Sequence, residues 1–240
     1  MIEVFNKKKQ VHGEFNGGEI IENKPIGFPH EKGGIKAYSN LFYWAYARAN
    51  IDSTIGLHPH KGFEIMSYVI KGSIKHYDTL IKKWKNLEKG DVQIIQSGYG
   101  ISHSEAINKD ASIFQIWFDP NLEKSIFHKP KYKDYPSKKF RSNGPKKNII
   151  GNNSPIKIES EGIEIFELIL EKDYTIETNL DQILSIYILS GDLNIYDNKL
   201  KKDDFVKIQK MNKTEIKINE KSKLFCILSP VKPSYKTYIS

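Results

Sequence analysis

The stretch YVIKGSIKHYD, residues 68–78, decides the fold, because the chain contains its pattern twice. The second copy is YILSGDLNIYD, residues 187–197, and Tyr, Gly, Tyr and Asp match at a constant offset of 119. A weaker match sets KGDV at 89–92 against KDDF at 202–205, at an offset of 113. Each copy has the pattern of a strand, a glycine turn and a return strand. The shared pattern indicates a duplicated β unit.

Strand signals also dominate the rest of the chain. Short runs of Val, Ile, Tyr and Phe are separated by Gly, Asn, Asp and Lys, and few windows have sustained helical periodicity. The clearest runs lie at 63–70, 91–96, 112–118, 163–170, 183–189 and 223–229. Many short strands at close spacing are typical of a sandwich or barrel. We therefore predict an all-β protein of two tandem β-barrels.

The composition excludes several classes of protein. Of the 240 residues, 39% are hydrophobic and 28% are charged, which allows a packed core and argues against a wholly disordered chain. No run approaches the roughly 18 apolar residues of a membrane-spanning helix, and the first residues carry no secretory signal. The single cysteine, Cys226, excludes an internal disulfide and a multi-cysteine metal site. We expect a cytoplasmic protein without membrane contact.

The formal net charge of +8 is concentrated in residues 121–148, which hold nine Lys or Arg against two acidic residues. The segment also contains Pro130, Pro136, Gly144 and Pro145. We interpret it as a solvated basic linker between the two halves. Contact with an anion or a nucleic acid is the alternative. No nucleic-acid-binding motif accompanies the charge, so we expect no nucleic-acid partner.

All seven histidines lie at or before position 128, so any histidine chemistry belongs to the first half of the chain. Two motifs stand out: HPH, with His58 and His60, and HSE, with His103 and Glu105. Residues i and i+2 of a strand point to the same face, so each pair converges. On neighbouring strands the two pairs would place three imidazoles and one carboxylate around one point. That donor set suits Fe(II), Mn, Ni, Cu or Zn.

The carboxylate of this site has two candidates. Glu64 has the same parity along the chain as the two histidines of HPH, and parity alone cannot separate it from Glu105. Glu64 could be a ligand, a residue that orients an imidazole, or a surface residue. The remaining histidines are interpreted as structural or exposed; they are His12, His30, His76 and His128.

The second copy lacks the residues needed to rebuild the site. The offset of 119 places Glu177 and Asn179 at the positions of the HPH histidines, and the offset of 113 places Ile216 and Ile218 at those of His103 and Glu105. We therefore predict a single metal per chain, in the first half. Aromatic residues are plentiful near the motifs, and we expect most in the core and a few lining a pocket for a flat ligand. They are Phe42, Tyr43, Trp44, Tyr46, Phe63, Tyr68, Phe114, Trp117 and Phe118.

Four stretches together resemble the pirins of the cupin superfamily: HPHKGFE (58–64), YVIKGSIKHYD (68–78), KGDVQIIQSGYGISHSE (89–105) and QIWF (115–118). The resemblance implies a bicupin, with two tandem cupin-type (jelly-roll) β-barrels. It implies a metal-binding barrel over residues 1–135 and a second barrel without metal ligands over residues 136–240.

The family pattern also implies the ligands and the metal. Carried onto this chain, the ligands are His58, His60, His103 and Glu105, which favours Glu105 over Glu64. The resemblance implies one divalent transition metal, iron first, with Mn, Ni, Cu, Co or Zn as alternatives. Ile94, Ile95, Gln96 and Tyr99 replace residues often seen beside the second motif, and this departure leaves the substrate open.

Two functions follow as expectations. Some pirins have quercetin 2,3-dioxygenase activity, so the first is a metal-dependent oxidoreductase that opens a flavonol-like, small aromatic or enolic ring with O2. Glu105 would then act as the catalytic base as well as a ligand. The alternative is a non-enzymatic, redox-responsive iron-binding module that presents a surface to a protein partner.

Overall fold

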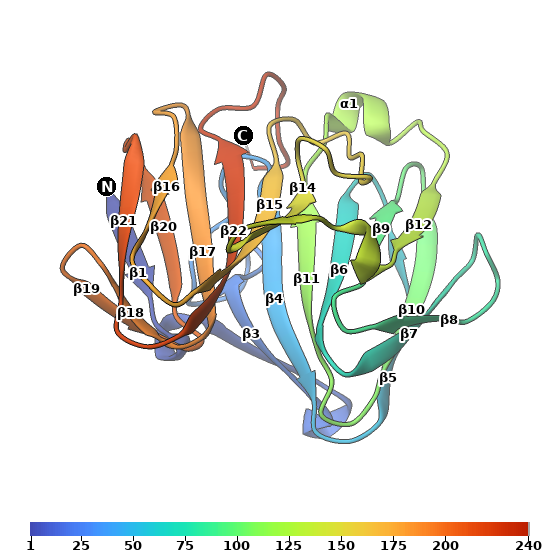
Figure 1. Ribbon diagram of the computed structural model, residues 1–240. Coiled ribbons are helices and arrows are strands. Elements are labelled where there is room, and N and C mark those ends of the chain that lie inside the picture. The colour runs from blue at the N-terminus through green and yellow to red at the C-terminus, as the bar shows by residue number, and fades with distance from the viewer. Residues whose placement is uncertain (240) are drawn as a thin grey trace. The chain divides into compact units, whose positions relative to one another are not determined.

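The computed structural model describes residues 1–239 and consists almost entirely of antiparallel strands in four sheets (Figure 1). The chain divides into two compact units, each with one seven-stranded and one four-stranded sheet. The first barrel comprises residues 10–139, 158–160 and 234–239, and the second barrel comprises residues 1–9, 140–157 and 161–233. The prediction of an all-β chain with two barrels is confirmed.

The first barrel holds eleven strands and one short helix. The strands are β2 (Val11–Phe15), β3 (Ile20–Ile26), β4 (Leu41–Ala49), β5 (Ser53–His60), β6 (Glu64–Lys71), β7 (Ser73–Asp78), β8 (Lys85–Glu88), β9 (Val92–Gln96), β10 (Ile101–Ile107), β11 (Ser112–Phe118) and β12 (Lys131–Tyr135). The helix α1 spans Leu122–Ser125. The larger sheet has the order β12-β9-β6-β11-β4-β3-β2, and the smaller one β5-β10-β7-β8.

The second barrel also holds eleven strands. They are β1 (Ile2–Phe5), β13 (Ser142–Asn143), β14 (Lys146–Ile150), β15 (Glu164–Leu170), β16 (Tyr174–Glu177), β17 (Gln182–Ser190), β18 (Asp192–Ile195), β19 (Asn198–Lys201), β20 (Phe205–Gln209), β21 (Lys213–Ile218) and β22 (Ser222–Pro230). Its sheets have the orders β1-β20-β17-β22-β15-β14-β13 and β16-β21-β18-β19. Each strand has a counterpart at the same place in the first barrel, which supports the duplication inferred from the repeat. The described residues also contain three single turns of 3-10 helix: Lys7–Lys9, Asn16–Gly18 and Ser137–Lys139.

The glycine shared by the two repeat copies is required by the turn it occupies. Gly72, between β6 and β7, has a φ of +70°, and Gly191, between β17 and β18, has a φ of +98°. A Cβ at Gly72 would lie 2.8 Å from the Cβ of Ala111, and one at Gly191 would lie 2.0 Å from the Oγ of Ser222. Only a residue without a side chain fits both the backbone conformation and the space. The repeat therefore conserves a turn rather than a functional side chain.

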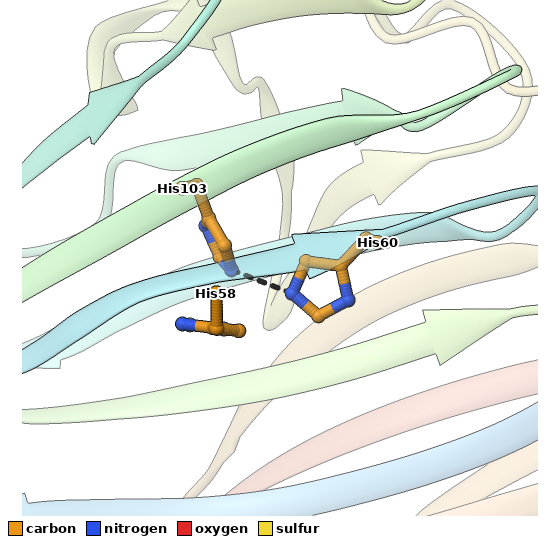
Figure 2. Close-up of side chains that lie close together, drawn as sticks. All are labelled: His58, His60 and His103. Carbon is orange, nitrogen blue, oxygen red and sulfur yellow. Dashed lines mark hydrogen bonds between the residues drawn. The ribbon is translucent and has the colours of Figure 1, made fainter.

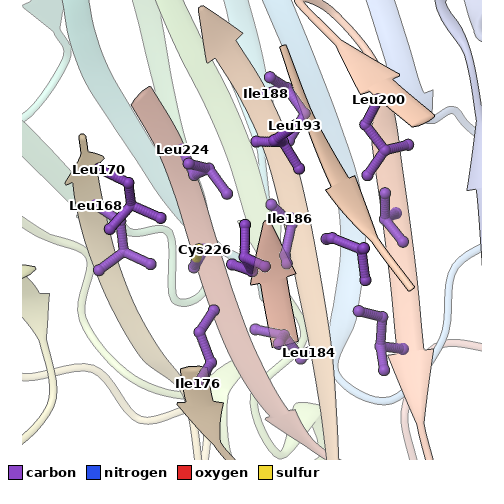
Figure 3. Packing of buried hydrophobic residues seen from close by; sticks show 14 of the residues in the cluster. Leu168, Leu170, Ile176, Leu184, Ile186, Ile188, Leu193, Leu200, Leu224 and Cys226 are labelled. Atoms are coloured by element: carbon purple, nitrogen blue, oxygen red, sulfur yellow. The ribbon is translucent and has the colours of Figure 1, made fainter. Parts of the chain in front are cut away.

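The interior of the second barrel is filled with aliphatic side chains from both sheets (Figure 3). Ile186, Ile195, Ile216 and Cys226 all belong to this cluster. In the first barrel the corresponding cluster is smaller and contains Val69, Ile74, Ile107 and Ile113, among others. The interior of the first barrel therefore also holds polar side chains, among them His76, His103 and Glu105, which are fully buried.

The basic segment 121–148 connects the two units in sequence, as predicted, but it is folded into both and is not a solvated linker. It contains α1 and β12, which pairs with β9 at the edge of the first barrel, and β13 and β14 of the second barrel. Lys131 and Lys133 point outward from β12. Charged side chains on an edge strand hinder pairing with another sheet. Lysine and proline therefore mark a sheet edge here. Composition alone cannot distinguish such an edge from a solvated connector.

Among residues 1–239, the helices are all too short or too polar to span a membrane.

Candidate metal centre

Three histidines from two adjacent strands meet inside the first barrel (Figure 2). His58 and His60 lie on β5, and His103 lies on β10 directly opposite His58. One ring nitrogen from each histidine lies within 4.8 Å of those of the other two, and the Nε2 atoms of His60 and His103 are 2.8 Å apart. This is the only group of three or more metal-ligating side chains of this kind among residues 1–239. The predicted convergence of the histidines of the two motifs is therefore present.

The pairing of β5 with β10 and a hydrogen bond from one ring to the backbone of β5 position these rings. The pairing of β5 with β10 shifts register between His103 and Glu105, because Glu105 lies opposite Ile55. Within this irregularity, the Nδ1–H of His58 donates to the carbonyl oxygen of Gly56 at 2.8 Å. That hydrogen bond leaves Nε2 of His58 as the unprotonated nitrogen, as is common for metal-binding histidines.

The electrostatics of the site favour neutral imidazoles. Burial, followed by the neighbouring histidines, lowers the pKa of His60 to about 3 and that of His103 to about 2. Both rings are therefore uncharged at neutral pH and present nitrogen lone pairs. The neutral ring is the form that binds transition metals. Three such nitrogens at this separation fit the donor set of a single divalent ion.

Glu105 lies beside the three histidines but outside their group. It is completely buried on β10, on the same side of the strand as His103. Its Oε1 accepts a hydrogen bond from Ser67 Oγ at 2.7 Å, and its Oε2 accepts one from Gln115 Nε2 at 2.5 Å. The Nε1–H of Trp117 donates in turn to Gln115 Oε1 at 3.1 Å. The carboxylate is thus held in place, and its charge acts on His60, where it opposes the fall in pKa.

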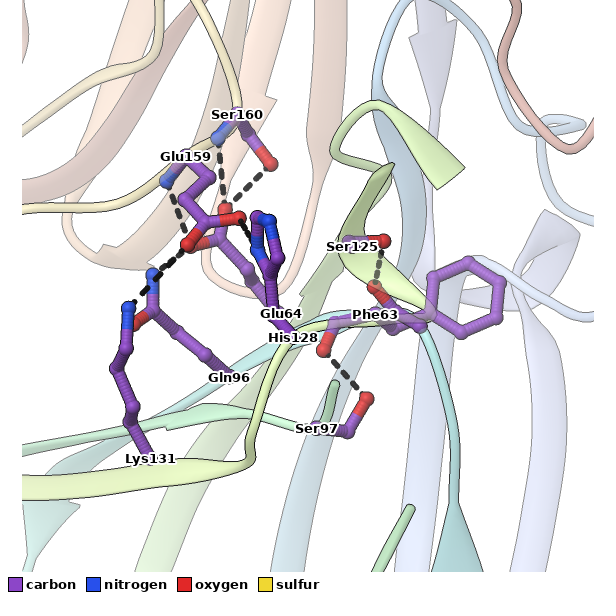
Figure 4. A network of polar contacts seen from close by, with 10 residues as sticks. Phe63, Glu64, Gln96, Ser97, Ser125, His128, Lys131, Glu159 and Ser160 are labelled. Atoms are coloured by element: carbon purple, nitrogen blue, oxygen red, sulfur yellow. Dashed lines mark hydrogen bonds and ion pairs between the residues drawn. The ribbon is translucent and has the colours of Figure 1, made fainter. Parts of the chain in front are cut away.

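Glu64 has a structural environment of its own (Figure 4). One carboxylate oxygen accepts hydrogen bonds from Gln96 Nε2 and the backbone N–H of Glu159, both at 2.7 Å. The other accepts from the backbone N–H of Ser160 at 2.8 Å and from its Oγ at 2.6 Å. Four donors therefore engage Glu64, and they fasten the segment 158–160 to β6. This explains its burial without any role at the histidines.

Sequence reasoning missed a buried pair next to the histidines. His76, which we interpreted as structural or exposed, is fully buried and bonded through Nε2 to Asp78 Oδ2 at 2.7 Å. Its ring lies 5.5 Å from that of His103 and stacks on Tyr132 at 4.4 Å. The alternation of β7 could have revealed it, because Ile74, His76 and Asp78 share one face.

A cavity of about 320 Å³ opens beside the histidines. His58, His60 and Gln115 form part of its wall, and aromatic rings form much of the rest. Among these, Trp117 packs edge-on against His60 at 4.7 Å. Tyr43 and Trp117 are thus the predicted aromatics that line the pocket, whereas Trp44, Tyr68, Phe114 and Phe118 are fully buried.

Strand pairing places aliphatic residues of the second barrel at the polar positions of the first. At the offset of 119, Ser67 corresponds to Ile186 and His76 corresponds to Ile195. Glu105 lies opposite His76 just as Ile216 lies opposite Ile195, so these two residues correspond. By the same reasoning Gln115, opposite Ser67, corresponds to Cys226, opposite Ile186. Ile216 therefore corresponds to Glu105 and not to His103, so the match predicted from the offset of 113 is wrong by two residues. It failed because the loop between the strands differs in length, while the absence of histidine is unaffected.

Residues 35–118, which contain both histidine motifs, match the family model described as Pirin. Over these residues the chain is similar to the pirin family of the cupin superfamily. A Zymomonas mobilis protein provisionally named quercetin 2,3-dioxygenase is 41% identical over 100 residues, which are 40% of this chain and 40% of that protein. The quercetin 2,3-dioxygenase of Escherichia coli K12 is 38% identical over 68 residues, 27% of this chain and 29% of the relative. The alignments therefore span less than half of these relatives.

The fold extends over a larger part of the chain than the sequence similarity. The crystal structure of the bacterial pirin YhhW from Escherichia coli, in complex with nickel(II), matches with a TM-score of 0.82 at 22% identity. The match covers 96% of this chain and 99% of that one. The comparison confirms the two-barrel cupin architecture.

Proposed function

We propose that this protein is a metal-dependent dioxygenase that opens a flavonol-like ring with O2. The observation that carries the proposal is the convergence of three histidines, two of which, His58 and His60, line an aromatic cavity. A bound divalent transition metal would supply a Lewis acid for a substrate hydroxyl and a redox centre for dioxygen. The names of the relatives from Zymomonas mobilis and Escherichia coli support a flavonol substrate.

In this proposal His58, His60, His103 and Glu105 hold the metal. Iron is our first choice, with Mn, Ni, Cu, Co and Zn as alternatives; the nickel(II) in the related pirin structure supports a divalent ion. We propose that residues 1–135 carry this chemistry and that residues 136–240 serve as scaffold. We also propose a cytoplasmic setting, because the single cysteine, Cys226, is a buried free thiol.

The side chains of the barrel prepare the substrate. Trp117 and Tyr43 present flat faces to an aromatic ring and exclude water from it. Glu105 is the base: its Oε2 accepts the proton of the substrate hydroxyl, which leaves an enolate. Gln115 and Ser67 keep the carboxylate oriented during that transfer, because each binds one of its oxygens.

The experiment combines metal analysis with oxygen uptake. We expect purified protein, loaded anaerobically with iron, to hold one ion per chain and to consume O2 with quercetin. His103→Gln should abolish both properties, whereas His128→Gln, at a half-exposed histidine bonded to Glu159, should leave both unchanged. Metal binding without oxygen uptake across a flavonol panel would refute the activity and favour the redox-responsive module. Equal metal content in the two variants would refute the site.

A further inference from the structure

We propose that Glu22 and Tyr43 form a polar subsite in the cavity beside the histidines. This subsite selects ligands that carry hydroxyl groups on the aromatic ring that lies farther from the histidines. The inference deepens the proposed function and rests on it, because it concerns the ligand of the same cavity. It identifies the ligand class as aromatic rings with adjacent phenolic hydroxyls.

Glu22 is a buried carboxylate with unused hydrogen-bonding capacity. It lies on β3, lines the cavity and is only 6% exposed. Its Oε1 accepts one long hydrogen bond, from the hydroxyl of Tyr43 at 3.3 Å, and its Oε2 lies 3.8 Å from Lys24 Nζ. At that distance Lys24 forms an ion pair with Glu22, but it donates its hydrogen bond to Glu31 Oε1. A carboxylate can accept about four hydrogen bonds, and leaving them unmade in a buried site is costly.

Tyr43 extends the subsite by a second polar atom. Its ring stacks on Phe28 at 4.5 Å and forms part of the aromatic wall. Because its hydroxyl proton is directed at Glu22, the phenolic oxygen keeps lone pairs that can accept from a ligand. Burial, followed by the charge of Glu22, raises the pKa of Tyr43, so the hydroxyl stays protonated.

The two acceptors suit a pair of neighbouring hydroxyls. One ligand hydroxyl would donate to the carboxylate of Glu22 and the next to the oxygen of Tyr43. A cationic ligand is disfavoured, because Lys24 already places a positive charge 3.8 Å from the carboxylate. The surrounding wall, with Phe15, Phe28 and Ile55, is apolar and fits the ring that carries the hydroxyls.

The test compares two flavonols that differ only in this ring. Quercetin carries two adjacent hydroxyls on its B ring, and galangin carries none. Dissociation constants would be measured by quenching of tryptophan fluorescence, anaerobically, in iron-loaded protein. We expect wild type to bind quercetin at least about tenfold more tightly than galangin, a ratio typical of one or two net hydrogen bonds.

Substitutions then assign the preference. Glu22→Met and Tyr43→Phe should each reduce the ratio at least about threefold while changing galangin affinity little. Glu14→Met, at an exposed carboxylate on the neighbouring strand, should leave it unchanged. If neither variant alters the ratio although wild type binds and consumes quercetin, the subsite is refuted and the proposed function stands. If wild type binds neither flavonol, both are refuted. Tyr43→Phe keeps the buried ring that stacks on Phe28, so this variant decides the question if Glu22→Met does not fold.

Discussion

The metal-free first barrel should lose stability in mild acid, because two of its histidines stay neutral when folded. The folded-state pKa values of His60, about 3, and His103, about 2, lie below the value of about 6.5 for an unfolded chain. The unfolded state therefore binds more protons as the pH falls below 6.5. Stability is fully present above that pH and declines as the pH falls toward 3.

At pH 5 the loss of folding free energy from the two histidines depends only on their protonation in the unfolded chain. Both histidines remain neutral in the folded state there, whereas each is about 97% protonated when unfolded, which costs about 2 kcal/mol per histidine relative to pH 8. Together they remove about 4 kcal/mol, a large share of a typical stability of about 5–15 kcal/mol. Asp119 acts in the opposite direction, because burial raises its pKa to about 6 and protonation then favours the folded state.

A comparison between variants isolates the two histidines from Asp119. All three tryptophans, Trp44, Trp84 and Trp117, lie in the first barrel, so their fluorescence in urea reports the unfolding of that barrel. Measurements would be made with a chelator at pH 8 and pH 5, on wild type and on the double variant His60→Gln, His103→Gln. We expect wild type to lose about 4 kcal/mol more than the variant. Losses that agree within about 1 kcal/mol would refute the reasoning.

Three further predictions concern other parts of the two barrels. Glu64→Gln should destabilise the first barrel by about 1–3 kcal/mol in urea unfolding, because an amide cannot accept from all four donors. Glu88→Gln, at an exposed side chain, should leave the free energy of unfolding unchanged. Equal effects of the two substitutions would contradict the anchoring role of Glu64. Gly98→Ala should destabilise the first barrel by at least about 1 kcal/mol, because Gly98 has a φ of +52° and a Cβ there would lie 2.2 Å from the backbone oxygen of His128. Gly56→Ala should have a smaller effect on the free energy of unfolding, because no atom lies within 4 Å of the added Cβ. Cys226 should react with a thiol reagent only as the second barrel unfolds, because burial raises the pKa of its thiol. Rapid labelling of the native protein would contradict that burial.

Local patterns in the sequence were sufficient to predict the strands and the duplication. The six predicted strand runs coincide with β6, β9, β11, β15, β17 and β22 to within one residue at each end. Gly72 and Gly191 were readable because a turn with positive φ excludes side chains, whatever the rest of the fold does. The two histidine motifs were readable for a similar reason, since residues two apart on a strand share a face.

The tertiary structure decided everything that depends on which strands are neighbours. Parity along the chain could not separate Glu64 from Glu105. Only the packing shows that the backbone N–H groups of residues 159–160 donate hydrogen bonds to the carboxylate of Glu64. The underpartnered carboxylate of Glu22 could not be found from the chain, since its partners lie on other segments. Strand propensity and face are set by neighbours in sequence, whereas register, burial and hydrogen-bond partners are set by contacts between distant segments, which no local pattern encodes.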